Sequence, residues 1–321
     1  MLKFGLSILA WMHFLRLKEH PFGILYFHRV LKQAEPFCPD DWTENQFEQL
    51  VAVLSKQFNI LPISEALELQ RRDQLPAKTL CLSFDDGYQD NATLAAPILE
   101  KYGVRGSFFV ATEGTERGYL WNDELAYFLG EGFVNTSKPE SIAFEGTEYN
   151  LKSVEHRSVV YLDLVGKLKV LPNNQRDQGL ESIKSQLGAT QHPPRCMMTT
   201  KQLQSLQDNG HDIGAHTHSH SILSYQSSNT ARSEMTQSIN YLNQVLDKPV
   251  TLFAYPNGWV GRDFTIEHER LLEELGLEYG VATNDGGVTT KTRKTAIPRF
   301  MPYRKQLDQF CLSAMKIMGE T

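Results

Sequence analysis

Short apolar runs alternate with segments of helical periodicity along most of the chain. The runs are rich in β-branched and aromatic residues and predict strands at 23–28, 79–84, 107–111, 212–216, 251–255, 279–283 and 296–300. Between them the periodicity predicts helices at 44–58, 90–102, 200–209, 230–246 and 265–275. Strands that alternate with crossover helices are typical of a parallel sheet. We expect a closed or nearly closed α/β barrel rather than an open sheet.

One long stretch, residues 115–195, interrupts this alternation. It contains a helix candidate at 122–129, a short β pair at 144–149 and mixed helical periodicity up to residue 187. Insertions of this size in a barrel usually occupy a loop between a strand and its following helix, over the face that carries the chemistry. We therefore predict a cap or groove wall within a barrel that spans 21–321, and not an independent domain.

The first 20 residues form a separate apolar segment. Its apolar run, 4–15, lies behind a single lysine and is interrupted by His13. The run is short for a membrane span and lacks a clear small-residue cleavage site. It predicts a helix that docks on the barrel or lies on a membrane surface, with a signal peptide as the alternative. On this basis we expect a cytoplasmic protein, with peripheral membrane contact through this segment.

The bulk composition is that of a soluble globular protein, with 41% hydrophobic and 22% charged residues in a chain of 321. A formal net charge of -6 leaves no basic footprint, so we expect no nucleic-acid partner. The four cysteines lie far apart and form no CxxC pair. This spacing favours reduced thiols over a disulfide framework or a cysteine zinc site.

The clearest chemical motif is SFDDG at 83–87, at the end of an apolar run. Adjacent carboxylates such as Asp85 and Asp86 repel each other and are costly to desolvate, unless a cation or a proton is shared there. Gly87 allows a tight turn that keeps both carboxylates at the barrel mouth. An ordinary Asp-Gly turn with solvated acids is the competing interpretation, and the motif alone does not decide between them.

A second motif, HTHSH at 216–220, also follows a predicted strand. His216 and His220 are four residues apart, which would place both imidazoles on one side of a helical turn and suits a shared divalent metal ion. His218 should point elsewhere, as an outer partner or a surface residue. Asp86 would complete an Asp/His/His set with open positions for water and substrate. An exposed polar loop is the alternative.

Taken together, the two motifs resemble those of the polysaccharide deacetylase family, also called the NodB-homology or carbohydrate esterase family 4 group. That family shows [T/S]-F-D-D-G and then H-[S/T]-x-x-H, and the surrounding pattern fits from about residue 23 to the C-terminal helix. The resemblance implies a distorted (β/α)7 barrel with a long insertion in a βα loop. It also implies that Asp85 is the general base and that Asp86, His216 and His220 bind the metal ion.

The resemblance implies an activity as well. The chain is expected to be a metal-dependent hydrolase that removes acetyl groups from N-acetylated sugars of an acetylated glycan, with Zn²⁺ as the expected ion. A deacetylase of another glycan, such as peptidoglycan, chitin or an O-acetyl sugar, would use the same site. A catalytically weak or inactive carbohydrate-binding protein is the alternative of a different class.

The remaining family motifs match less well. The segment FAYPNG at 253–258 occupies the place of an R-x-P-[F/Y]-G motif, with Ala254 where arginine is common. Its turn can still present the backbone N–H of Asn257 as one donor to an oxyanion. A plain turn at the end of a strand is equally compatible with this sequence.

The family's late L-x-H motif, which supplies a catalytic acid, is missing from the C-terminal strands. The N-terminal segment YFHRV at 26–30 resembles the permuted, poly-N-acetylglucosamine-type branch of the family. The first and last strands are neighbours in a closed barrel, so His28 is our acid candidate. A buried structural histidine is the alternative.

Arg299 ends the last predicted strand. Its guanidinium can hold Asp85 by a charge-assisted pair and replace the arginine missing at Ala254. A surface salt bridge is the competing interpretation. Within the insertion, Trp121 and Asp123 are candidates for lining a sugar groove, although apolar packing of Trp121 is the more common outcome.

The candidate residues share one property that does not depend on the family. They fall at or just beyond the carboxyl ends of predicted strands, the face where barrel enzymes assemble their sites. They are His28, Asp85, Asp86, His216, Pro256 and Arg299.

Overall fold

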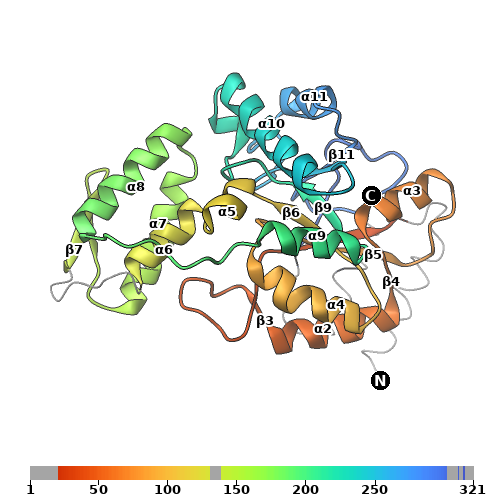
Figure 1. Ribbon diagram of the computed structural model, residues 1–321, viewed down its shortest axis with the longest axis horizontal. Coiled ribbons are helices and arrows are strands. Elements are labelled where there is room, and N and C mark those ends of the chain that lie inside the picture. The colour runs from red at the N-terminus through yellow and green to blue at the C-terminus, as the bar shows by residue number, and fades with distance from the viewer. Residues whose placement is uncertain (1–20, 131–138, 302–309, 311–313, 315–321) are drawn as a thin grey trace.

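The structure, a computed structural model, describes residues 21–130 and 139–301 together with Phe310 and Ala314 (Figure 1). The apolar segment expected at 1–20 lies outside the described residues, and so does its expected membrane contact. Within the described part of the chain, no helix is both long and apolar enough to cross a bilayer.

Parallel strands form the central sheet, in the spatial order β1, β5, β6, β9, β10 and β11, while β4 pairs with the start of β5. Their bounds are β1 Gly23–Phe27, β4 Asn59–Ile60, β5 Thr79–Phe84, β6 Ser107–Val110, β9 Asp212–Ala215, β10 Leu252–Ala254 and β11 Tyr279–Val281. All their pairings are parallel, which requires the crossover connections predicted from the sequence.

A short segment after β11 closes this sheet. Phe300 bridges Leu25 of β1, and Ile297 bridges Val281 of β11, both in the parallel sense. Main-chain hydrogen bonds of 2.7 to 3.2 Å accompany these bridges. The curled sheet therefore returns to its first strand, and the predicted (β/α) barrel is confirmed. The strand expected at 296–300 is present only as these isolated bridges.

Most of the barrel's helices pack against the outer face of the sheet, whereas α3 Ile63–Arg71 packs against the cluster that fills the barrel interior. The bounds of the others are α2 Glu44–Gln57, the π-helical η1 Asn91–Ala95, α4 Ala96–Lys101, α5 Thr112–Arg117, α9 Thr200–Asp208, the 3-10 turn η2 Leu223–Tyr225, α10 Ser228–Val245 and α11 Ile266–Glu274. A two-stranded ribbon, β2 Val30–Leu31 and β3 Trp42–Thr43, follows β1. Each predicted helix is present, but the one expected at 90–102 begins as a π-helix, and the sequence pattern did not predict α3.

Capping boxes fix the first residue of two helices. Thr43 accepts the Gln46 N–H, and the Gln46 side chain accepts the Thr43 N–H in return, at the start of α2. Thr199 and Gln202 make the same pair of contacts at the start of α9. Each box satisfies two N–H groups that a helix start would otherwise leave unpaired.

The strands are apolar on both faces. Outward-facing side chains such as Leu82 and Phe84 pack under the helices in the largest core cluster. Inward-facing side chains such as Ile24, Cys81 and Ile297 fill the barrel interior as a second cluster. A strand buried on both faces reads as a continuous apolar run, which is the pattern that identified these strands.

The barrel interior is crowded at β9. A Cβ atom on Gly214 would lie 2.6 Å from ring atoms of Phe109 on the neighbouring strand β6. Such an approach is too close for any side chain, so glycine at this position leaves room for the phenylalanine ring. The ring in turn fills the interior beneath the candidate site.

The predicted insertion forms a lobe beside the barrel, at the left of Figure 1. Its elements are α6 Trp121–Leu129, β7 Ser141–Phe144, β8 Thr147–Asn150, α7 Val154–Leu168 and α8 Asn173–Leu187. They share a hydrophobic cluster separate from both barrel clusters. Trp121 lies in this cluster and is 3% exposed. The groove position considered for Trp121 is therefore wrong, because its side chain is part of the lobe's core.

Two residues of α8 attach the lobe to the barrel. The Asn173 side chain donates to Glu234 of α10 at 2.8 Å and accepts from the Ser221 hydroxyl at 2.7 Å. Arg176 donates to the Ser219 carbonyl at 3.2 Å. Both serines belong to the loop after β9, so the lobe supports the segment that carries the candidate histidines.

Candidate active site

The first site motif follows β5. Asp85 continues the inward alternation of Cys81 and Ser83, as the period of two in a strand requires. Asp86 and Gly87 then adopt left-handed backbone, with φ of 75° and 91°. An aspartate at positive φ is uncommon and carries conformational strain, which is typical of functional sites. The reversal lets the two adjacent carboxylates reach different partners.

The second motif is a loop, and the helical turn predicted from its spacing is wrong. The described backbone between β9 and η2 contains no helical residue. Thr217 and His220 have φ of 61° and 56°, which is especially unfavourable for the β-branched threonine. The Thr217 hydroxyl stabilises the loop by accepting the Ser221 N–H at 3.1 Å.

This loop nevertheless brings three potential ligands together. Asp86 Oδ1 lies 3.4 Å from His216 Nε2 and 3.1 Å from His220 Nε2. The ligand atoms of the three residues all lie within 4.8 Å of one another. Asp86 Oδ1 is buried and accepts no hydrogen bond of normal geometry from the described residues. Lone pairs that face a common point in this way fit a divalent metal ion, and one carboxylate with two imidazoles suits zinc.

The main chain sets the proton position on His216. Its Nδ1 lies 2.7 Å from the Ala254 carbonyl at the end of β10, and the residue is 2% exposed. A carbonyl oxygen can only accept, so Nδ1 carries the proton and Nε2 presents its lone pair to Asp86 and His220. Metal-binding histidines are commonly oriented by such an outer partner.

Arg299 holds the neighbouring carboxylate, Asp85. The guanidinium Nη1 and Nη2 donate to the two carboxylate oxygens at 2.7 and 2.8 Å. Arg299 is 0% exposed and Asp85 is 3% exposed. The guanidinium also donates to the Ser83 hydroxyl and the Ala282 carbonyl, both at 3.1 Å. Two parallel charge-assisted hydrogen bonds fix the orientation of the carboxylate.

Both carboxylates are held in the ionised form. Burial raises the pKa of Asp85, but the charge of Arg299 lowers it below its usual value. Burial also raises the pKa of Asp86, but the contacts with His220 and then His216 lower it well below its usual value. The site therefore contains one anion suited to bind a cation and a second suited to accept a proton.

His28 follows β1, beside β5 in the sheet. The preceding Phe27 carbonyl accepts the Asp85 N–H at 2.8 Å, which ties the two strand ends together. The imidazole lies edge-on to the Tyr26 ring, with 6.0 Å between centroids. Because β1 and β5 are parallel neighbours, the residue that follows β1 lies on the same face of the barrel as Asp85. Its role as general acid stays a prediction.

Asn257 lies in the turn after β10, with φ of 59°. The Thr283 hydroxyl donates to its carbonyl at 2.6 Å and fixes the turn. The turn begins just after Ala254, whose carbonyl holds His216, so it lies on the face of the site. Donation from its backbone N–H to an oxyanion stays a prediction.

Two further candidates lie outside the metal set. His218 Nδ1 pairs with the hydroxyl of Thr112 on α5 at 2.9 Å. Asp123 is half-buried where the lobe meets the barrel and accepts from the Tyr88 hydroxyl at 3.0 Å and the Leu120 N–H at 2.8 Å. Its carboxylate also caps the start of α6, and a position in a sugar groove stays a prediction.

The sequence interpretation missed Glu234, which supports the histidine loop from α10. Its carboxylate accepts the N–H groups of His218 and Ser219 at 3.0 and 2.8 Å, and the Ser219 hydroxyl at 2.8 Å. Glu234 lies on the buried face of this amphipathic helix with Met235 and Ile239. A charged residue at a core position of a helix is the signal that would have identified it.

A second missed pair supports the segment after β1. Asn91, at the start of the π-helix η1, is fully buried and donates to the His28 carbonyl at 2.8 Å. The Asp90 carboxylate accepts the Val30 N–H at 3.2 Å and pairs with Arg29 at 2.8 Å. Single π-helical turns often occur at functional sites, and this one fixes the backbone of His28.

Residues 72–280, more than half of the chain, match the sequence profile of the family described as polysaccharide deacetylase. The chain belongs to the polysaccharide deacetylase family. The resemblance seen in the two motifs is thereby confirmed, and the protein is an enzyme of this family. His28 and Arg299 fall outside the matched residues, so their assignment depends on their geometry.

Solved structures of deacetylases share the fold. Streptococcus pyogenes deacetylase PplD, in complex with acetate, is 18% identical with a TM-score of 0.62, over 93% of this chain and 99% of that one. BC0361, a polysaccharide deacetylase from Bacillus cereus, is 14% identical with a TM-score of 0.57, over 92% and 69%. A de-N-acetylase from Aggregatibacter actinomycetemcomitans is 14% identical with a TM-score of 0.51, over 87% and 94%. A search of curated proteins found no matching sequence.

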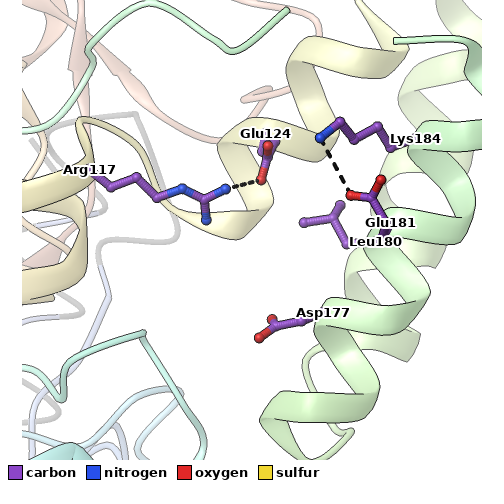
Figure 2. Close-up of a pocket in the computed structure, with 6 residues that line it drawn as sticks. All are labelled: Arg117, Glu124, Asp177, Leu180, Glu181 and Lys184. Carbon is purple, nitrogen blue, oxygen red and sulfur yellow. Dashed lines mark hydrogen bonds and ion pairs between the residues drawn. The ribbon is translucent and has the colours of Figure 1, made fainter. Parts of the chain in front are cut away.

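A separate hollow of about 240 Å³ lies between α5, α6 and α8 (Figure 2). It is lined by Arg117, Glu124, Asp177, Leu180, Glu181 and Lys184. Arg117 pairs with Glu124 at 2.7 Å, and Lys184 pairs with Glu181 at 3.4 Å. Each cation has an acidic partner, so the hollow presents no uncompensated positive charge. Its lining residues are distinct from the Asp86, His216 and His220 set.

Replacing His216 with alanine should weaken Zn²⁺ binding by about 100-fold, because one of three ligands is lost and even an outer partner commonly contributes 10- to 100-fold. Calorimetric titration of metal-free protein with Zn²⁺ measures the change. His218→Ala is the matched control, since this ring lies in the same loop but pairs with Thr112. It should keep the wild-type affinity. Unchanged affinity in His216→Ala would mean that the ion binds elsewhere.

Proposed function

We propose that this enzyme is a metal-dependent hydrolase that removes acetyl groups from the N-acetylated sugars of a polysaccharide or glycoconjugate and releases acetate. Membership of the family supports deacetylation of a polysaccharide. The proposal adds the metal dependence, the amide linkage and the class of sugar. Zn²⁺ is the proposed ion because one carboxylate and two imidazoles are ligands that zinc prefers.

One observation carries the proposal: a second ionised carboxylate, Asp85, lies next to the Asp86, His216 and His220 set. A structural metal site would gain nothing from another buried anion, whose desolvation is costly. Arg299 fixes this anion in place, as a proton acceptor requires. Three protein ligands leave open coordination positions for water and substrate, as in catalytic zinc sites.

The side chains of the barrel mouth then have distinct tasks. A bound divalent ion would polarise the acetamide carbonyl and lower the pKa of a water molecule. Asp85 accepts a proton from the attacking water molecule as the water oxygen forms a bond to the carbonyl carbon. The Asn257 N–H donates to the carbonyl oxygen as it gains negative charge. His28 gives a proton to the sugar nitrogen as the C–N bond breaks, which yields acetate and a free amine.

Similarity in fold to a de-N-acetylase favours the amide linkage over an ester. The same chemistry would serve peptidoglycan, chitin or an O-acetylated sugar, so the loops of the barrel mouth and the lobe are proposed to select the glycan. These loops occupy the carboxyl ends of the strands, where barrel enzymes acquire their specificity.

Acetate release from a panel of acetylated glycans tests the proposed function. Protein stripped with a chelator and reloaded with Zn²⁺ is offered oligomers of N-acetylglucosamine, chitin, peptidoglycan and an O-acetylated xylan. We expect release from the N-acetylglucosamine oligomers, only after the ion is restored, and none from His216→Ala under the same conditions. Zinc-loaded wild-type protein that binds a glycan but releases no acetate would instead be a sugar-binding protein.

A further inference from the structure

An exposed tryptophan lies in the loop after β10. Trp259 is two residues beyond Asn257, and 47% of its surface is accessible to solvent. Trp42 and Trp121, which the structure also describes, are 5% and 3% exposed. Trp259 is therefore the described tryptophan whose indole is available to a ligand.

Several hydrogen bonds hold the backbone of the loop around Trp259. The backbone N–H of Trp259 donates to the buried Asp263 carboxylate at 2.9 Å. The backbone carbonyl of Trp259 accepts the N–H groups of Asp263 and Arg262 at 2.9 and 3.1 Å. The Val260 N–H donates to the Asn284 side chain at 2.9 Å. Because these bonds already hold the backbone, little backbone entropy is lost when a ligand binds to the loop.

Two connections place this loop beside the metal site. It starts after Ala254, whose carbonyl bonds to His216 at 2.7 Å. On its other side, the Asp263 carbonyl accepts the N–H of Ser224, which follows His220 by four residues. Trp259 is five residues beyond Ala254, so the Cα atoms of the two residues lie at most about 18 Å apart. A short oligosaccharide can span that distance.

We propose that Trp259 is a stacking platform for a sugar ring of the glycan, at a unit near the one that loses its acetyl group; this inference rests on the proposed function. A pyranose presents C–H groups on its ring face, and the face of an indole is electron-rich. Stacking buries both apolar faces without selecting a particular pattern of hydroxyl groups.

Arg262 completes the platform. Its guanidinium carbon lies 5.6 Å from the centroid of the indole ring, and its N–H groups donate to Asp263 at 2.8 and 3.0 Å. The arginine thus holds the orientation of the ring by a cation–π contact while Asp263 holds the arginine. Asp263 fixes both the backbone of Trp259 and the residue that contacts its ring.

Kinetics on two substrates test the inference. Against a pentamer of N-acetylglucosamine, Trp259→Ala should raise KM about tenfold and leave kcat nearly unchanged, because stacking of a remote ring binds the ground state and the transition state equally. Against a small aryl acetate, which cannot reach the platform, both constants should stay at wild-type values. Trp259→Phe should recover most of the affinity, and Ile266→Ala, an equally exposed apolar residue at the start of α11, should behave as wild type.

A binding measurement separates this inference from the proposed function. Titration of metal-free protein with the pentamer should shift the tryptophan emission of the wild type to shorter wavelength, with no shift in Trp259→Phe. Loss of this difference, or equal KM values for wild type and Trp259→Ala, would overturn the platform. So would reduced binding of Trp259→Ala to anionic phosphatidylglycerol vesicles with an unchanged KM, because the ring would then contact lipid. Absence of acetate release by the wild type, with the emission shift intact, would refute only the deacetylase activity.

Discussion

An Asp85→Asn variant should keep its metal ion and lose about 10³-fold in turnover of acetamide substrates. The substitution removes the proposed proton acceptor but none of the three ligands in the Asp86, His216 and His220 set. An asparagine amide has nearly the same shape as the carboxylate but cannot take a proton at neutral pH. Zinc titration and kcat on an N-acetylglucosamine oligomer measure the two quantities separately.

The same substitution should also lower the stability of the fold. Arg299 is 0% exposed and donates two hydrogen bonds to Asp85. Removing one partner of a buried ion pair leaves the other charge uncompensated and typically costs about 3–5 kcal/mol of unfolding free energy. Asp85→Glu retains the charge but moves the carboxylate by one methylene, so it should unfold at a higher temperature than Asp85→Asn and still turn over slowly.

Asp212→Asn is the matched control for this experiment. Its carboxylate is half-buried, lies at the opposite end of the barrel and accepts from Ser64 and Ser107. This variant should be less stable than the wild type and retain its turnover. If folded, zinc-loaded Asp85→Asn turned over as fast as the wild type, another group would have to accept the proton.

The alternation within strands explains why much of the site could be predicted. Asp85 follows Cys81 and Ser83 at steps of two, and Arg299 follows Ile297 in the same way, so their side chains face the barrel interior. Parallel strands end at one edge of the sheet, which brings these residues together from distant parts of the sequence. Apolar pattern and chain direction were sufficient for this inference.

The conformation of the histidine loop could not be predicted in the same way. A spacing of four suits a helical turn, but the loop instead uses positive φ at Thr217 and His220. That conformation is maintained by Glu234, which lies on a separate helix. Contacts of this kind are tertiary and leave no local trace in the loop sequence. The three ligands were therefore predicted together from an incorrect local geometry.

The lobe shows the same limit. Local periodicity predicted its helices and its β pair, but not that α6 packs against α7 and α8 to form a separate core. That packing buries Trp121 and leaves Asp123 as the acceptor at the start of α6. Pairing between elements far apart in sequence decides which apolar residues are buried, so residue type alone could not decide between groove and core for Trp121.

A His28→Ala variant should cleave N-acetylglucosamine oligomers about 10³-fold more slowly than the wild type, and should hydrolyse an activated aryl acetate at nearly the same rate. An amide nitrogen leaves poorly until it is protonated, whereas an aryl oxide scarcely needs a proton. His28 follows the end of β1. The carbonyl of the preceding residue accepts the Asp85 N–H, and the His28 carbonyl accepts a hydrogen bond from the Asn91 side chain. The measured quantity is the mutant-to-wild-type rate ratio on each substrate.

The ratio on two substrates distinguishes a proton donor from a structural histidine. Loss of a structural side chain would disturb the metal site or the substrate pocket and slow both reactions alike. Loss of a proton donor slows only the reaction whose leaving group needs the proton. His268→Ala, whose ring accepts the Thr265 N–H at the start of α11, should slow neither. Asn91→Ala, which frees the His28 carbonyl, should show a weaker form of the same selectivity, because the imidazole would be less well placed.

Equal losses on the amide and the ester in His28→Ala would assign His28 to substrate binding or to the fold. The proton would then have to come from another group at the barrel mouth.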